Sequence, residues 1–116
     1  MKWLAETEEE SPSGMPERAV IDGVWWKIIS QPGYRTMSGE YGRTTNHDLT
    51  MVIDADVAHA MLQDTLMHEH LHAMSMIRLA SEDQLSERQV MAMAPCILMW
   101  MRANPGIVEW LQNRGD

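Results

Sequence analysis

The chain of 116 residues has little cysteine and little positive charge. Its single cysteine, Cys96, excludes an intramolecular disulfide and fits a reducing compartment. Lysine and arginine number 9 against 17 aspartates and glutamates, which gives a formal net charge of −8. The basic residues are scattered and form no stripe of the kind that follows phosphate groups, so we expect no nucleic-acid partner.

Long apolar runs are also missing from the sequence. No segment approaches the roughly 18 apolar residues that a membrane-spanning helix needs, and the apolar run in residues 1–6 is too short for a signal peptide. We therefore expect a soluble, cytoplasmic protein with no membrane partner. The length indicates one domain, residues 20–116, after an acidic and turn-rich stretch in residues 1–19 that we expect to be a flexible tail.

Phenylalanine is absent, whereas methionine occurs 12 times. Flexible thioethers can fill a hydrophobic core in place of aromatic rings, and they can also line a substrate groove. Because most of these methionines recur at helical spacing, core packing is the favoured interpretation.

The most informative stretch is residues 65–74, which contain the pattern His-Glu-x-x-His at His68, Glu69 and His72. On a helix, two histidines four residues apart lie roughly 40° apart on one face, which is the geometry that zinc requires. A further protein ligand would complete the site and leave one position for a water. Glu69 could then act as the general base. His70 points about 200° away from His68 and cannot bind the same metal.

The sequence around this motif predicts a buried helix. Between Val57 and Leu79 the only formal charges are Asp64, Glu69 and Arg78, and apolar side chains occupy most of the circumference. Two histidines and a glutamate inside such a helix are costly without partners, so a metal site explains them better than a solvated face does. The alternative is a pair of hydrogen-bonded core histidines with a surface glutamate.

Two segments before this helix have the pattern of β-strands. Residues 24–29 are aromatic and β-branched after a turn at Asp22-Gly23, and residues 49–53 alternate between two faces. Residues 34–43 are interpreted as a short, irregular strand or a loop, and Asp54 and Asp56 as caps of the long helix. The order predicts an α+β fold, in which a small antiparallel or mixed sheet of about three strands precedes the buried helix and one or two C-terminal helices.

The C-terminal third begins with a helix start signal. Ser86 or a neighbour is the expected cap, and Gln89 occupies the capping-box position of a helix that runs toward Arg102, with Pro95 inside it. Glu87 heads the otherwise apolar inward stripe of this helix and requires a partner there. Cys96 lies about 180° around from Glu87, which disfavours it as a ligand and favours a plain buried thiol. Residues 104–111 predict a short helix that covers the core.

Together these segments resemble the small HExxH metallopeptidase-like proteins that are common in phages and prophages. The resemblance is carried by Thr65-Leu66-Met67-His68-Glu69-His70-Leu71-His72-Ala73, with Leu85-Ser86-Glu87-Arg88-Gln89-Val90 and Asn104-Pro105 after it. Such proteins are similar to ImmA/IrrE-type and minimal gluzincin peptidases. The resemblance implies a zincin-like fold in the bacterial cytoplasm, zinc held by His68, His72 and Glu87, and Glu69 as the base. Spacing alone leaves Glu82 and Glu109 open as the third ligand.

The sequence therefore predicts a zinc-dependent metallopeptidase that acts on a protein or peptide lying along the sheet edge. Two histidines and one carboxylate favour zinc but also suit ions such as Fe(II). An oxyanion donor is expected, and Tyr34, Tyr41 and His47 are the candidates. His47 and His59 are interpreted as structural first and as ligands second. Two alternatives remain: a zinc-stabilised, catalytically silent binding module of phage or prophage origin, and a small α+β interaction protein without metal.

Overall fold

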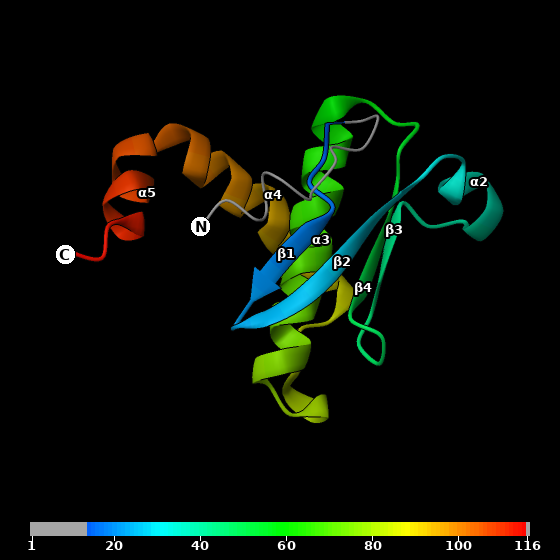
Figure 1. Cartoon of the computed structure of the whole chain (residues 1–116), viewed down its shortest axis with the longest axis horizontal. Coiled ribbons are helices and arrows are strands. Elements are labelled where there is room, and N and C mark those ends of the chain that lie inside the picture. The colour runs from blue at the N-terminus through cyan, green and yellow to red at the C-terminus, as the bar shows by residue number, and fades with distance from the viewer. Residues whose placement is uncertain (1–13, 116) are drawn as a thin grey trace.

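The computed structural model describes residues 14–115 and has the α+β architecture that the sequence predicts (Figure 1). The described residues form a four-stranded mixed sheet in the order β1-β2-β4-β3. In chain order the elements are β1 (Arg18–Ile21), β2 (Val24–Gln31), α2 (Tyr34–Ser38), β3 (Gly42–Thr45), β4 (Thr50–Asp54), α3 (His59–Arg78), the short 3₁₀ helix η1 (Ser81–Asp83), α4 (Glu87–Ala103) and α5 (Pro105–Gln112).

The centre of the sheet is the parallel pair of β2 and β4, in which Ile28 lies opposite Met51. Both strands bury alternate side chains, as the period of a strand requires: Trp26 and Ile28 on β2, Met51 and Ile53 on β4. These are the two strands that the sequence predicts. The buried side chains of both strands form a hydrophobic core together with Leu62 and Ala73 of α3.

Strand β1 is an addition to the predicted sheet. It pairs with β2 in antiparallel orientation through a two-residue turn at Asp22 and Gly23, whose φ angles of 52° and 78° are those of a type I′ hairpin. The strand begins at Arg18 and therefore overlaps the stretch expected to be a tail, of which residues 1–13 lie outside the described residues. Because it has four residues and buries only Ile21, it has no clear pattern in the sequence.

The segment before β3 forms the helix α2 rather than the expected irregular strand or loop. The carboxylate of Asp54 holds it in place: one oxygen accepts a hydrogen bond from the Arg35 backbone N–H at 2.7 Å and the other from the Asp56 backbone N–H at 2.7 Å. The prediction that Asp54 and Asp56 cap the long helix is therefore wrong, because α3 has Ala58 at its N-cap and no side-chain cap. Asp54 instead joins the first turn of α2 to the loop that follows β4.

Helix α3 lies across one face of the sheet and contacts β3, β4 and α4 (Figure 1). Its side chains Leu62 and Ala73 enter the core formed by the sheet, and Val90 and Ala94 of α4 are fully buried as well. None of the helices in residues 14–115 has the length and hydropathy that crossing a membrane requires. The helix with the motif is thus the element that connects the sheet to the C-terminal helices.

The C-terminal end of α4 and the whole of α5 extend away from the sheet (Figure 1). The prediction that α5 covers the core is wrong, because α5 has no buried residue and Trp110 is 74% exposed. The prediction that the methionines pack mainly in the core is also wrong. In the described residues Met15 and Met51 are buried, whereas seven others are exposed: Met37, Met61, Met74, Met91, Met93, Met99 and Met101.

Candidate metal centre

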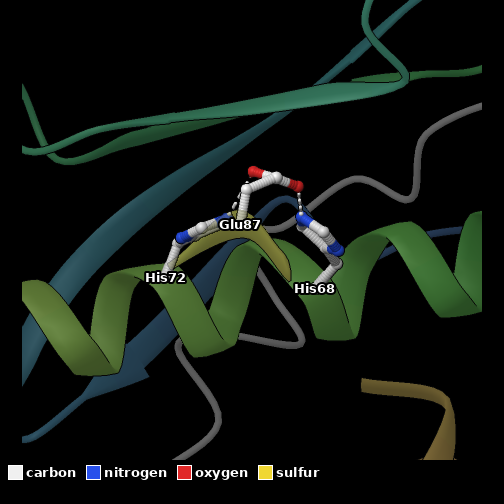
Figure 2. Close-up of side chains that lie close together, drawn as sticks. All are labelled: His68, His72 and Glu87. Carbon is white, nitrogen blue, oxygen red and sulfur yellow. Dashed lines mark hydrogen bonds and ion pairs between the residues drawn. The ribbon is translucent and has the colours of Figure 1, made fainter. Parts of the chain in front are cut away.

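Three of the residues singled out in the sequence meet at one point between α3 and α4. His68 and His72 project from the same face of α3, and their rings are 4.9 Å apart between centroids. The Glu87 carboxylate lies between them: Oε1 is 2.5 Å from His68 Nε2, and Oε2 is 3.0 Å from His72 Nε2 (Figure 2). One ligand atom from each residue lies within 4.8 Å of the others, so these side chains could hold a metal ion together.

The path of the chain after α3 explains how Glu87 reaches the histidines. Helix α3 continues to Arg78, so residues 79–86 must return along it before α4 begins. The Leu85 backbone N–H donates a hydrogen bond to the buried Ser75 Oγ at 2.7 Å, which fixes the end of this return. Ser75 is three residues beyond His72, or about 4.5 Å along the helix axis. The next residues then start α4 beside the two rings.

The predicted capping box at the start of α4 is confirmed. The Gln89 backbone N–H donates to Ser86 Oγ at 3.1 Å, and the Ser86 backbone N–H donates to the Gln89 side chain at 2.9 Å. Two N–H groups that would otherwise lack partners are satisfied in this way. Because Glu87 is the first residue of the helix, the capping box also determines where its carboxylate lies.

The other candidate ligands lie elsewhere in the described residues. The cluster does not include Glu82 or Glu109, which the sequence left open as third ligands. His70 uses its Nδ1–H to donate to the Leu66 carbonyl oxygen at 2.8 Å, which is a structural role. His47 and His59 are exposed. Cys96 is exposed as well, so the prediction of a buried thiol is wrong.

Glu69, the predicted general base, is buried next to the cluster and is only 5% exposed. Its Oε1 accepts a hydrogen bond of 2.6 Å from the hydroxyl of Thr44 on β3. Burial raises the pKa of the Glu69 carboxyl above its ordinary value, while the bond from Thr44 and the neighbouring His68 and His72 act in the opposite direction. The sequence gives no signal for Thr44, because the contact joins residues that are 25 positions apart.

Gly42 allows β3 to approach α3 closely at this point. A Cβ atom at this position would lie 2.9 Å from Thr65 Cγ2, 3.1 Å from Glu69 Oε2 and 3.1 Å from the Val52 carbonyl oxygen. All three distances are shorter than an ordinary van der Waals contact. A glycine inside a strand often marks such an approach, which is the signal in the sequence that could have identified it.

An open cleft of about 620 Å³ lies between β3, α3 and the start of α4, and it contains all three candidate ligands. Tyr41 also lines it, whereas the other two candidate oxyanion donors, Tyr34 and His47, do not. The remaining lining residues come from the loop before β3, from β3 itself and from the two helices: Gly39, Glu40, Gly42, Arg43, Thr44, Met61, Asp64, Thr65, Glu69, Met76 and Met91.

The donor set suits a divalent metal ion. Two imidazole nitrogens and one carboxylate provide three ligands, so a fourth position remains for water or substrate. No family model, curated protein or solved structure matches this chain.

Proposed function

We propose that the protein is a zinc-dependent metallopeptidase. The observation that supports this most is the convergence of His68, His72 and Glu87 in an open cleft, next to a buried glutamate that follows the first histidine directly. A closed structural zinc site has four protein ligands, whereas a catalytic site has three and one open position. Three ligands in a cleft large enough for a peptide segment favour catalysis.

Each residue has a specific role in this proposal. His68, His72 and Glu87 hold the ion, and zinc, when bound, acts as a Lewis acid and lowers the pKa of a coordinated water to about 7. Glu69 would accept a proton from the water that attacks the scissile carbonyl and deliver it to the leaving amine as the C–N bond breaks. Thr44 orients the Glu69 carboxylate through its 2.6 Å hydrogen bond.

The edge strand β3 provides a surface on which a peptide substrate can lie. It pairs with β4 on one side only and is last in the strand order of the described sheet. Its residues Gly42, Arg43 and Thr44 line the cleft. An extended protein or peptide segment that paired with this edge would add a strand to the sheet and pass over the metal centre.

A second candidate function, that of a zinc-stabilised binding module, is favoured by the burial of Glu69. With 5% exposure and a hydrogen bond to Thr44, this carboxylate has limited contact with the cleft. In this case zinc would join the start of α4 to α3 and stabilise the fold. The two functions predict different behaviour of a variant that keeps the ligands but lacks the base.

The test compares the zinc-loaded wild-type chain with Glu69→Gln on a mixed peptide library, with cleavage products identified by mass spectrometry. The peptidase cleaves in the presence of zinc, and Glu69→Gln loses cleavage while it keeps zinc. The binding module cleaves nothing, yet zinc raises the melting temperature of both proteins. Glu82→Gln is the matched control, because it changes an exposed carboxylate outside the cluster. If zinc affects neither cleavage nor melting temperature, both functions are excluded.

A further inference from the structure

The cleft contains a carboxylate that takes no part in the metal centre. Asp64 lies on α3, four residues before His68, so its side chain is on the same face of the helix, about 40° around and roughly 6 Å along the axis. It lines the same cleft as the candidate ligands. A group that extends from the metal along α3 toward the N-terminus of the helix therefore reaches Asp64.

One oxygen of the half-buried Asp64 carboxylate lacks a hydrogen-bond partner among the described residues. Its Oδ1 is covered from solvent and accepts no hydrogen bond from any donor among residues 14–115. A buried carboxylate oxygen without a donor is costly, and a native protein usually keeps such a group for a reason other than stability.

The other charges of the cleft are already compensated. Glu40 and Arg43 form an ion pair of 2.7 Å with each other. Glu87 lies between the two histidines, and Glu69 accepts the hydroxyl of a threonine. Asp64 is therefore the charged side chain of the cleft for which the described residues provide neither a counter-ion nor a hydrogen bond.

We propose that Asp64 is a specificity residue that binds the cationic side chain of a peptide, arginine or lysine, next to the bond at the metal centre. This inference rests on the proposed function. A guanidinium or ammonium group supplies the positive charge that the described residues do not place beside this half-buried carboxylate. Met61, one turn before Asp64 and also in the cleft, offers an apolar surface to the aliphatic stem. The net charge of −8 attracts basic peptides at long range.

The preference can be measured by binding, without hydrolysis. Arginine hydroxamate and citrulline hydroxamate carry the same zinc-binding group, the same α-amino group and side chains of nearly the same shape, but only the arginine side chain is charged. Their affinities for the zinc-loaded chain are measured by calorimetry. We expect arginine hydroxamate to bind about tenfold more tightly or better, because a charge-assisted hydrogen bond discriminates at that level.

Two matched variants identify the source of the preference. Asp64→Asn should bind both hydroxamates with equal affinity, whereas Asp83→Asn, which removes an exposed charge from η1 outside the cleft, should keep the wild-type preference. The melting temperature of metal-free Asp64→Asn should not fall below that of the wild type, since the substitution removes a half-buried negative charge for which the described residues provide no counter-ion. That result separates loss of recognition from loss of folding.

The outcomes distinguish this inference from the proposed function. Equal affinities of the wild type for the two hydroxamates, or an arginine preference that survives in Asp64→Asn, overturn the role of Asp64. If neither hydroxamate binds and the chain takes up no zinc, the metal centre and this inference fail together. If arginine hydroxamate is preferred through Asp64 but no library peptide is cleaved, the subsite is established and the peptidase activity is excluded.

Discussion

The contact between β3 and α3 makes Gly42→Ala the most sensitive single test of how the cleft is built. The added methyl group would lie 2.9 Å from Thr65 Cγ2 and 3.1 Å from both Glu69 Oε2 and the Val52 carbonyl oxygen. The carbonyl belongs to the neighbouring strand β4 and cannot rotate away as a side chain can. We therefore expect β3 to move outward and to take Thr44 with it.

The cost follows from the crowding of a packed region by one methyl group. Such substitutions typically lower the free energy of unfolding by about 1–3 kcal/mol. For a domain of about 100 residues, each kcal/mol corresponds to a fall in melting temperature of roughly 4–8 °C. Displacement of Thr44 also weakens its hydrogen bond to Glu69, so any peptidase activity should fall together with stability.

The assay is urea unfolding of the metal-free proteins, followed by fluorescence of the tryptophans. Gly106→Ala is the matched control, because a Cβ atom there has no neighbour within 4 Å and the residue lies in the first turn of α5. Both substitutions lower the entropy of the unfolded chain equally, which by itself raises the free energy of unfolding by about 0.4–1 kcal/mol. The difference in unfolding free energy between the two variants therefore reports the contact at Gly42. If Gly42→Ala and Gly106→Ala unfold at the same urea concentration, the close approach of β3 to α3 is refuted.

Three other substitutions test the surroundings of the metal centre. Because burial raises the folded-state pKa of Glu69 above its unfolded value of about 4.3, its ionised form destabilises the metal-free protein. Glu69→Gln should therefore have a higher free energy of unfolding than the wild type in urea at pH 8 and lose this difference below about pH 4. An equal difference at both pH values would show that burial does not raise the pKa of Glu69. Ser86→Ala removes a cap and should cost about 1 kcal/mol in the same assay, with weaker zinc binding because Glu87 begins that helix; unchanged stability would show that the capping box contributes little. Thr44→Val should lower kcat/KM for a cleaved peptide about 10–100-fold without loss of zinc, and Thr44→Ser should restore it; an equally active Thr44→Val would remove Thr44 from the proposed mechanism.

The parts of the fold that the sequence predicts are those determined by local signals. The period of β2 and β4 places Trp26 and Met51 in the core, and the Ser86–Gln89 capping box identifies the first residue of α4. The spacing of His68 and His72 needs only a helix to bring the two rings together. Each of these depends on residues within a few positions of one another, where backbone geometry leaves little choice.

The parts that the sequence does not predict depend on contacts between distant segments. Strand β1 has one buried side chain and gains its place through pairing with β2. Aspartate is a residue type that often caps helices, which is why the sequence predicts Asp54 as a cap of α3. Its carboxylate instead accepts a hydrogen bond from the backbone N–H of the distant Arg35. Whether Glu87 reaches the histidines depends on the return of the chain along α3, which the bond between Leu85 and Ser75 fixes.

The exposed apolar residues of α5 show a different limit. Hydrophobicity indicates that a side chain favours burial, but it does not identify the surface that buries it. Ile107, Trp110 and Leu111 have the i, i+3, i+4 spacing of a core-facing stripe, and yet they are 48%, 74% and 60% exposed. Composition alone could not distinguish this arrangement from a helix packed on the sheet.

Zinc content is the decisive measurement for the proposal that His68, His72 and Glu87 together hold one zinc ion. Tag-free protein is supplied with zinc, dialysed and measured by elemental mass spectrometry, alongside His72→Ala, Glu87→Gln and the control Glu82→Gln. We expect close to one zinc per chain in the wild type and in Glu82→Gln, and little in the other two variants. A wild-type chain without zinc, or a Glu87→Gln variant that retains it in full, would contradict the proposed metal centre.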